Sequence, residues 1–574
     1  MSASVKLALL AALLFVAWTY DARADKKTVC TITVNSPDEK EIFRRSLPQD
    51  DFQFVELVER GRPDWLASAC RKDVRCDVLL ISGHFDDGTE FYSDRLDVRE
   101  SLPVEEMQRA SCSDSCPGLF SQLKEVYLFG CNTLQAQPLR SASAEIARSL
   151  VRSGHSPADA ERLSRLLNER HGESNRDRMR QIFKDVPVIY GFSSKAPLGP
   201  VAGSMLDRYF QSASSGEIGR GRASPRLLSL FAPSSMTVTT GLSESDPGAG
   251  LRRDVCQFSD DRLPAAQKVV FVHQLLNREI AEVRMLLDHI EKYVASLSET
   301  EQQIPAVANA LGAIARDAAA RTRYLDFARD ADQPAIRARM LELAATLGWL
   351  SPAEKRAELL RMIGEQLARN SLSTTEVSLV CALNKGHELD QELQQLQLSP
   401  AQANKVPHAA VLACLGSTDA HARVLRALMS SSEEEVQIAQ IYLHYRPIAD
   451  ATELRGVATG IARMNGSDAQ ARALDTLAPY HLSDRESLEA LTRLFPLAKS
   501  VNVQRAIAGI LIRSDFKTIA TPQFVKTLRQ SRLKSPDGAD LIDILIRRLQ
   551  ASQAGTVGSA PGGSNIALRV GRGS

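Results

Sequence analysis

The sequence predicts an α/β domain with a mostly parallel sheet, followed by an all-α region of helical repeats. The chain has 574 residues, more than a single hydrophobic core usually serves. In its first part, short apolar runs rich in Val, Ile, Tyr and Phe alternate with helical stretches, which is the pattern of βαβ units. In its second part nearly every stretch has helical periodicity, and similar helices recur about every 33 residues.

The α/β domain is expected to span residues 25–211. Its apolar runs are short and rich in β-branched and aromatic residues, which favours strands over buried helices. The run CDVLLIS is apolar almost throughout, as in strands covered on both faces. The expected strands are Val29–Asn35, Phe52–Val58, Cys76–Ser82, Glu125–Gly130 and Val186–Gly191, with a small hairpin of Glu90–Tyr92 and Leu96–Val98. The expected helices are Pro37–Ser46, Ser101–Ala110, Ser141–Arg152, Pro157–Phe183 and Val201–Ser212.

Residues 212–261 are rich in Ser, Gly and Pro, with one strand-like piece at Met236–Thr240, so we interpret them as a linker or an irregular edge of the first domain. Residues 262–551 are expected to form the helical repeat domain. Val436-Gln437, Ala469-Gln470 and Val503-Gln504 each open an apolar helix, and this spacing is typical of an α-solenoid. The repeats resemble HEAT repeats, and an irregular helical array is the alternative. Residues 552–574 are Gly- and Ser-rich and are expected to be disordered.

The first 24 residues have the organisation of a secretory signal peptide. Lys6 precedes an apolar run from Leu7 to Val16, and Ala22-Arg23-Ala24 is a small-x-small cleavage pattern. The apolar run is short for a membrane span. We expect cleavage before Asp25 and transport across the inner membrane to the periplasm or the extracellular space, without a membrane span in the mature chain. The alternative is an uncleaved N-terminal anchor.

Export changes the interpretation of the nine cysteines. In an oxidising compartment most cysteines pair, and an odd number leaves at least one thiol over. Cys70 with Cys76, and Cys112 with Cys116, are close enough in sequence for local disulfides, although connectivity does not follow from sequence. A zinc site at Cys112 and Cys116 is disfavoured, because no second Cys or His pair lies nearby at the usual spacing.

Chemically active side chains follow three of the expected strands. Cys76–Ser82 is followed by Gly83 and His84, and Glu125–Gly130 is followed by Cys131 and Asn132. The last strand, Val186–Gly191, leads into Phe192 and the polar residues Ser193, Ser194 and Lys195. Parallel α/β sheets bind ligands at the carboxyl ends of their strands. A cysteine thiolate is a good nucleophile, and a neighbouring histidine can generate it. Gly83 and Gly130 permit tight backbone at these turns, and Asn132 is placed to hold the second one.

The segments CDVLLISGHFDDGTEF, KEVYLFGCNT and DVPVIYGFSS resemble the core of the caspase-like peptidase superfamily, which includes caspases, gingipains, separases and CHAT domains. The resemblance covers roughly residues 29–210. It implies a caspase-like fold in which His84 and Cys131 form a catalytic dyad. It also implies that the loop after the third segment, with Ser193, Ser194 and Lys195, shapes the substrate pocket.

The residues before Cys131 differ from the acidic or small pair of many family members, and a second departure bears on the oxyanion hole. Members of the family usually have Gly directly after the histidine, where its N–H contributes to the oxyanion hole, and here Phe85 occupies that place. Gly88, three residues later, is a candidate to compensate. Asp86 and Asp87 are either plain loop residues or groups that orient His84 or contact substrate.

Charge balance and absent motifs narrow the function. The chain has 70 Lys and Arg against 69 Asp and Glu, so no basic excess favours nucleic acid as a partner. It has no phosphate-binding loop, dinucleotide fingerprint, HExxH or GxSxG motif. We therefore expect an exported cysteine endopeptidase without metal or cofactor, whose repeats bind a protein or peptide substrate or a partner protein. The alternative is a catalytically inactive caspase-like fold that serves as a protein-binding scaffold in the cell envelope.

Overall fold

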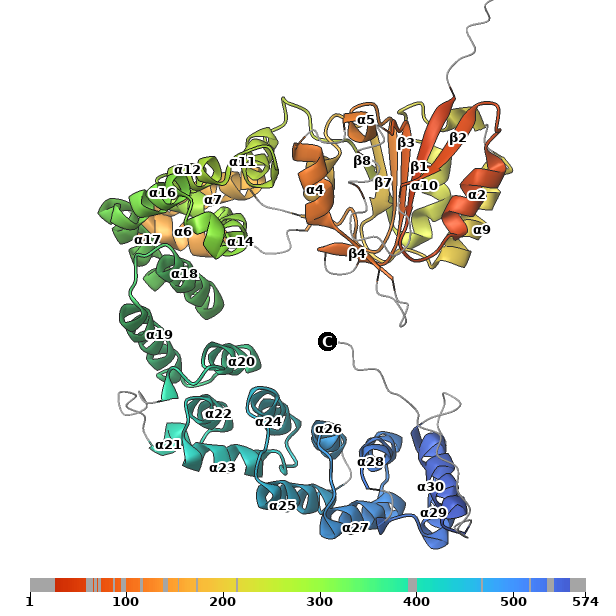
Figure 1. The fold of residues 1–574 in the computed structure, drawn as a ribbon, viewed down its shortest axis with the longest axis vertical. Coiled ribbons are helices and arrows are strands. Elements are labelled where there is room, and N and C mark those ends of the chain that lie inside the picture. Colours follow the sequence, from red (N-terminus) through yellow and green to blue (C-terminus); the bar gives the residue numbers. More distant parts are fainter. Residues whose placement is uncertain are drawn as a thin grey trace, which may run out of the picture. The chain divides into compact units, whose positions relative to one another are not determined.

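The structure is a computed structural model (Figure 1), and it describes the following residues: 26–57, 66, 70, 74–85, 88–93, 100–113, 117–137, 143–152, 154–171, 174–212, 215–390, 400–465, 468–515, 518–533 and 541–557. The predicted signal peptide, Asp86, Asp87 and most of the predicted C-terminal tail lie outside these residues. The chain divides into two compact units. One runs to Ala331 and includes Thr346–Trp349, and the other comprises Asp332–Ala345 and the chain from Leu350 onward.

The first unit contains a six-stranded, mostly parallel sheet, which confirms the α/β prediction. Its strand order is β2-β1-β3-β6-β7-β8. All neighbours are parallel except β7 and β8. The strands are β1 (Lys27–Thr33), β2 (Phe52–Glu56), β3 (Val78–Ser82), β6 (Glu125–Phe129), β7 (Val188–Phe192) and β8 (Met236–Thr239). β8 comes from the segment that we interpreted as a linker or an edge, and it forms the edge of the sheet.

Helices cover both faces of the sheet, so its central strands are apolar on both sides. On β3, Val78 and Leu80 face the helices α2 (Asp38–Ser46), α9 (Gly199–Phe210) and α10 (Pro225–Phe231). Leu79 and Ile81 face the opposite side, which is covered by α4 (Val104–Cys112) and α8 (Asn175–Ile182). The same alternation determines on which face of the sheet the side chains of the residues directly after each strand lie.

Two predicted helices have different limits in the structure. Ser101–Pro103 form a short strand, β5, antiparallel to β4 (Glu90–Tyr92), and α4 begins only at Val104 because Pro103 is extended. The predicted helix Pro157–Phe183 is two helices, α7 (Pro157–His171) and α8. Ser174 separates them, since its side chain caps α8 by accepting a hydrogen bond from the Asp177 N–H. The predicted hairpin strand Leu96–Val98 lies outside the described residues.

The helices that connect β6 to β7 pack on the helical part of the first unit. α6 (Ser143–Arg152) and α7 form a pair that contacts α13 (Ile280–Met285). Ile146, Leu150, Ala160 and Ala281 form a small apolar core there. This packing explains why the unit extends to Ala331, beyond the residue 262 at which we expected the helical repeats to begin. The other helices of this part are α11 (Ala249–Ser259), α12 (Ala265–Leu276), α14 (Leu287–Ser296), α15 (Glu299–Gln302), α16 (Pro305–Arg316) and α17 (Ala318–Asp330).

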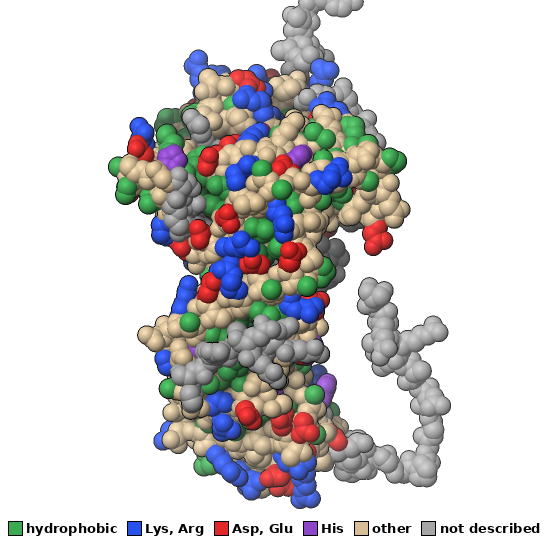
Figure 2. All heavy atoms as spheres, turned by 90° about the vertical axis from the view of Figure 1, so that its left-hand side faces the viewer, with side chains coloured by type: hydrophobic (Ala, Val, Ile, Leu, Met, Phe, Trp, Pro, Cys, Tyr) green, Lys and Arg blue, Asp and Glu red, His purple; other side chains and the backbone are tan. Residues whose placement is uncertain are grey.

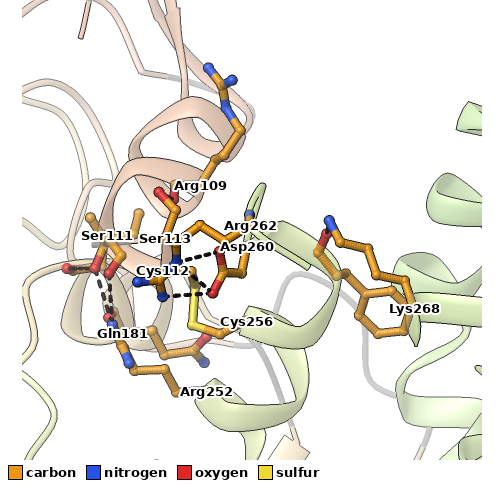
Figure 3. Close-up of a disulfide and its surroundings, with 12 residues drawn as sticks. Arg109, Ser111, Cys112, Ser113, Gln181, Arg252, Cys256, Asp260, Arg262 and Lys268 are labelled. Carbon is orange, nitrogen blue, oxygen red and sulfur yellow. Dashed lines mark hydrogen bonds and ion pairs between the residues drawn. A yellow bond between two sulfur atoms is a disulfide. The ribbon is translucent and has the colours of Figure 1, made fainter. Parts of the chain in front are cut away.

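The disulfides join segments that are distant in sequence. Cys30 pairs with Cys76, Cys112 with Cys256 and Cys381 with Cys414. The local pair of Cys70 with Cys76 is therefore wrong, because the β1–β3 pairing brings Cys30 beside Cys76. Cys112 is bonded to Cys256 (Figure 3), which excludes both its pairing with Cys116 and a zinc site. Cys70 is also disulfide-bonded, and Cys131 is the free cysteine of the described residues. Such pairing is typical of proteins outside the reducing cytosol.

The second unit is entirely helical in its described part. Helices α20, α22, α24, α26, α28 and α30 pack each against the next, and α25 packs against α27 in a second row (Figure 1). Its helices are α18 (Pro334–Thr346), α19 (Pro352–Leu367), α20 (Thr374–Leu383), α21 (Pro400–Ala403), α22 (Val406–Cys414), α23 (Thr418–Ala427), α24 (Glu433–Tyr445), α25 (Ala451–Ala462), α26 (Asp468–Leu477), α27 (Arg485–Leu494), α28 (Val501–Arg513), α29 (Pro522–Gln530) and α30 (Leu541–Val557).

The repeat marks Gln470 and Gln504 have the same structural role. Both side chains are completely buried in the first turn of an apolar helix. The Gln470 amide donates to the carbonyl oxygens of Ile461 and Met464, and the Gln504 amide donates to those of Phe495 and Ser531. Each amide thus satisfies carbonyl groups at or just beyond the ends of neighbouring helices, the preceding one for Gln470 and both the preceding one and α29 for Gln504. The two glutamines share one contact, a hydrogen bond to the carbonyl nine residues earlier, and differ in the other.

The surface agrees with the balanced composition. Lys and Arg side chains are interspersed with Asp and Glu side chains over the face shown in Figure 2. Of the helices that the structure describes, none combines the length and the apolarity needed to cross a bilayer.

Candidate functional site

His84 and Cys131 follow neighbouring parallel strands at equivalent positions. β3 and β6 pair in register, with Ser82 opposite Phe129, and each of the two residues lies two positions beyond that pair. The ladder continues past the strand ends, because the Gly83 N–H donates to the Phe129 carbonyl at 3.0 Å. Since side chains alternate along a strand, both residues fall on the face that carries Val78 and Leu80. The sheet therefore brings an imidazole and a thiol to one edge and one face.

The two glycines before these residues allow their turns to approach closely. A Cβ atom at Gly130 would lie 2.8 Å from the Gly83 carbonyl oxygen and 2.8 Å from the Phe85 Cβ. A Cβ atom at Gly83 would lie 3.1 Å from the Val34 Cβ. Distances below 3 Å are not tolerated between such atoms, so Gly130 in particular is required by the packing.

His84 is held by the backbone of the neighbouring strand. Its N–H donates to the Tyr92 carbonyl and its own carbonyl accepts from the Tyr92 N–H, each at 2.9 Å. The imidazole is half-buried and lies 5.4 Å from the Tyr92 ring, measured between centroids. β4 thus fixes the backbone from which the imidazole extends.

Cys131 lies in a turn held by several hydrogen bonds. Its sulfur accepts a hydrogen bond from the Ala196 N–H at 3.4 Å. Asn132 has a left-handed backbone with φ of 60°, which Asn tolerates better than most residues. The Asn132 N–H donates to the Ser194 carbonyl at 2.7 Å, and its carbonyl accepts from the Asn175 side chain at 3.0 Å. The turn that presents the thiol is therefore braced from the β7 loop and from α8.

A small pocket of about 60 Å³ opens at this edge, and both His84 and Cys131 line it. Its other lining residues come from the turn after β1 and the first turn of α2, from the ends of β3 and β6, and from the loop before α9. They are Asn35, Ser36, Glu39, Ser82, Gly83, Phe129, Gly130, Ala196, Pro197, Leu198 and Gly199. Gly199 packs tightly here, because a Cβ atom on it would lie 2.0 Å from the Ser36 hydroxyl oxygen.

Glu39 is a buried acid in this pocket. Its side chain is 2% exposed, and its carboxylate lies 3.0 Å from the Ser82 hydroxyl. Burial removes water from the carboxylate and raises the pKa of Glu39 to about 7. Glu39 is not among the predicted site residues, because an acid near the start of a helix is usually explained by the helix dipole. The overlooked signal is that the end of β1 shares the sheet edge with His84.

The remaining predicted site residues are distributed as follows. Phe85 is fully buried in the core and its ring packs on Phe91, with centroids 4.6 Å apart. Ser193 and Ser194 are exposed and hydrogen bonded to Ser235, while Lys195 is exposed. The pocket is lined instead by the residues that follow them, Ala196–Gly199. Asp87 lies outside the described residues. Gly88 has a positive φ of 77° and packs against Asn175.

Within the described part of the chain, no group of His, Cys, Asp and Glu side chains is arranged to hold a metal ion. No protein-family model, no curated protein and no solved structure matches this chain.

Proposed function

We propose that the chain is an exported, caspase-like cysteine endopeptidase with Cys131 as the nucleophile and His84 as its proton carrier. One observation carries the proposal. The free cysteine of the described residues and an imidazole lie at equivalent register positions on neighbouring strands and line one pocket. Sheet edges of this kind are the usual binding sites of α/β folds.

The reaction follows from these two side chains. The Cys131 sulfur attacks the peptide carbonyl carbon after its proton passes to His84. The tetrahedral intermediate collapses, the C–N bond breaks, and His84 returns the proton to the leaving amine. Water then attacks the thioester with His84 as base, which releases the acid product and restores the thiol. The Ala196 N–H, which points to the sulfur, stabilises negative charge there.

The oxyanion requires donors on the same side of the pocket. We assign this role to the backbone N–H groups of Cys131 and of Phe85, the residue after His84. The buried Phe85 ring anchors its backbone between the sheet and Phe91. A side chain at this position is thus compatible with a donor N–H, because the ring points into the core.

Labelling with iodoacetamide at neutral pH, mapped by mass spectrometry, tests the dyad. We expect Cys131 in the wild type to react at least about tenfold faster than in His84→Ala, because only a thiolate reacts at an appreciable rate. Tyr445→Phe, a substitution in the second unit, is the control and leaves the rate unchanged. Equal labelling rates of Cys131 in wild type and His84→Ala would refute the proposed dyad.

The second unit is assigned a binding role, as an α-solenoid of HEAT-like repeats. Support comes from a groove of about 690 Å³ along α24, α26, α28 and α30. Charged residues of both signs line it, among them Glu433, Arg472, Asp475 and Arg513. An open groove with charges of both signs suits an extended peptide of a substrate or partner protein.

The alternative is a cell-envelope scaffold in which the α/β domain has no activity. The small volume of the Cys131 pocket favours it, since the space of about 60 Å³ must widen before a peptide enters. In that case the groove of the second unit carries the function. A Cys131 that labels no faster than a small-molecule thiol would support the scaffold. Location in the periplasm or outside the cell is proposed from the disulfides and the predicted signal peptide.

A further inference from the structure

The Cys131 pocket contains a buried carboxyl group that the dyad does not use. Glu39 lines the pocket together with His84 and Cys131, and it is held by Ser82, two residues before His84 on β3. A dyad peptidase needs no third acid at this place. The position of Glu39 therefore calls for a separate explanation.

No Lys or Arg side chain lines the described pocket beside this acid. The titratable side chains among the lining residues are Glu39, His84 and Cys131. Desolvation is the largest cause of the raised pKa of Glu39, and the charged side chain that raises this pKa further is another acid, Asp38. Burying a carboxylate without a cation is unfavourable, and a cation brought to it regains that free energy.

The walls beside Glu39 suit an aliphatic chain. Pro197 and Leu198 line the same pocket from the α9 side, and Leu198 is 69% exposed, which leaves its side chain open to a ligand. A ligand with an apolar stem and a positive end, such as a Lys or Arg side chain, matches this combination.

We propose that the Cys131 pocket selects ligands that carry a positive charge, with the Glu39 carboxylate as the group that binds the charge. Applied to substrates, this means peptides with Lys or Arg at the residue that enters the pocket, and that extension rests on the proposed peptidase function. The charge preference itself does not, because it holds for any ligand or reagent that reaches Cys131.

Charge-matched thiol reagents test the proposal without a substrate. The reagents are the 2-aminoethyl (cationic), 2-sulfonatoethyl (anionic) and methyl (neutral) methanethiosulfonates. In each reaction the Cys131 sulfur, having lost its proton, forms a disulfide with the reagent's sulfenyl sulfur while methanesulfinate leaves with the electron pair. Mass spectrometry of the modified Cys131 gives each rate, and Cys131→Ser gives the background.

The ratio of cationic to anionic rates is the measured quantity. We expect it to fall at least about tenfold in Glu39→Gln, because the attraction between opposite charges a few Å apart in a partly buried site is lost. Glu41→Gln is the matched control. It removes the same charge from the same helix, but its half-exposed side chain pairs with Arg44 and does not line the pocket. An equal fall in both variants, or none in Glu39→Gln, overturns the proposal.

Two further measurements keep the outcome clear. The neutral reagent must modify Cys131 at similar rates in wild type and Glu39→Gln, which shows that the pocket is intact. In the unmodified protein, the cationic-to-anionic ratio must exceed that of free N-acetylcysteine amide, and a ratio at or below it overturns the proposal even if the variant does not fold. Failure of the dyad proposal is distinguished from failure of the charge proposal. If His84 and Cys131 form no dyad, His84→Ala does not change iodoacetamide labelling, whereas the ratio of cationic to anionic rates is unaffected.

Discussion

Cys112 and Cys256 are 144 residues apart in the sequence, and their disulfide brings the Cα atoms to 5.0 Å. The bond joins the end of α4, which covers the sheet, to α11. Arg252, one turn before Cys256, adds hydrogen bonds to the Gln181 carbonyl at 2.8 Å and to the Ser111 hydroxyl at 3.2 Å (Figure 3). The closed loop contains β6, Cys131 and β7, so the thiol half of the candidate site lies within a covalently closed segment, while His84 on the neighbouring strand precedes that segment.

Removing this bond should destabilise the first unit. In the chain-entropy account a loop of this length contributes about 5 kcal/mol through the unfolded state. We expect Cys112→Ala with Cys256→Ala to lower the free energy of unfolding by up to about 5 kcal/mol, measured by urea unfolding. Cys381→Ala with Cys414→Ala, in the second unit, is the comparison and should leave the urea unfolding of the first unit unchanged. An unaltered urea midpoint for the first unit would contradict the expectation.

Gly130 should not tolerate a methyl group. In Gly130→Ala the new Cβ meets the Gly83 carbonyl and Phe85 at 2.8 Å, so the turns must separate. We expect a loss of stability of about 1–3 kcal/mol and a marked loss of Cys131 labelling. Gly456→Ala is the control, because this exposed glycine of α25 has open space around it. There the exchange should stabilise by about 0.5–1 kcal/mol. Equal changes of stability and of Cys131 labelling in Gly130→Ala and Gly456→Ala would contradict the requirement for glycine at position 130.

The stability of the first unit should depend on pH through Glu39. Its pKa of about 7 exceeds the ordinary value of 4.5, because burial disfavours the carboxylate. The folded state therefore keeps a proton that the unfolded state has lost, so this carboxyl favours folding least at high pH. From pH 5 to pH 8, the free energy of unfolding of the wild type should fall by about 2–3 kcal/mol relative to that of Glu39→Gln. Asp38 on the same helix and His84 and Cys131 across the pocket also face this region and are common to both proteins.

Urea unfolding of both proteins at the two pH values measures this difference. The loss is confined to the range between about 4.5 and 7, and above it the difference is constant. A difference that is the same at pH 5 and pH 8 would show that the Glu39 pKa is not raised.

The buried side chain of Gln504 should stabilise the second unit against unfolding. Its side chain satisfies the Phe495 and Ser531 carbonyls and accepts from the Leu533 N–H at 2.9 Å, all in a buried position. Gln504→Ala leaves these groups without partners, so we expect a loss of about 2 kcal/mol. Gln437→Ala removes the exposed glutamine at the corresponding repeat position and should change stability by less than about 0.5 kcal/mol. Thermal unfolding of the two variants is the measurement, and equal midpoints would refute the role of Gln504.

The sheet and its site edge were predictable because each depends on local pattern. Runs such as Val78–Ser82 are apolar enough to be read as buried strands, and parallel pairing then places His84 and Cys131 at one edge. The disulfide partners were not predictable, since Cys30 and Cys76 meet only through the strand order. Glu39 was not predictable as a pocket residue either, because its contact with Ser82 depends on how α2 packs on the sheet.

The packing of α6 and α7 against α13 has a consequence for any attempt to isolate the sheet. The two helices leave the chain between Cys131 and β7, and their apolar side chains, Ile146 and Leu150 among them, are covered by Ala281 and its neighbours. A fragment that ends after β8 would expose this apolar surface of α6 and α7 to solvent and would be prone to aggregate. The candidate site and the first helices after it thus form a single structural unit, and recombination or truncation between them would expose its apolar core.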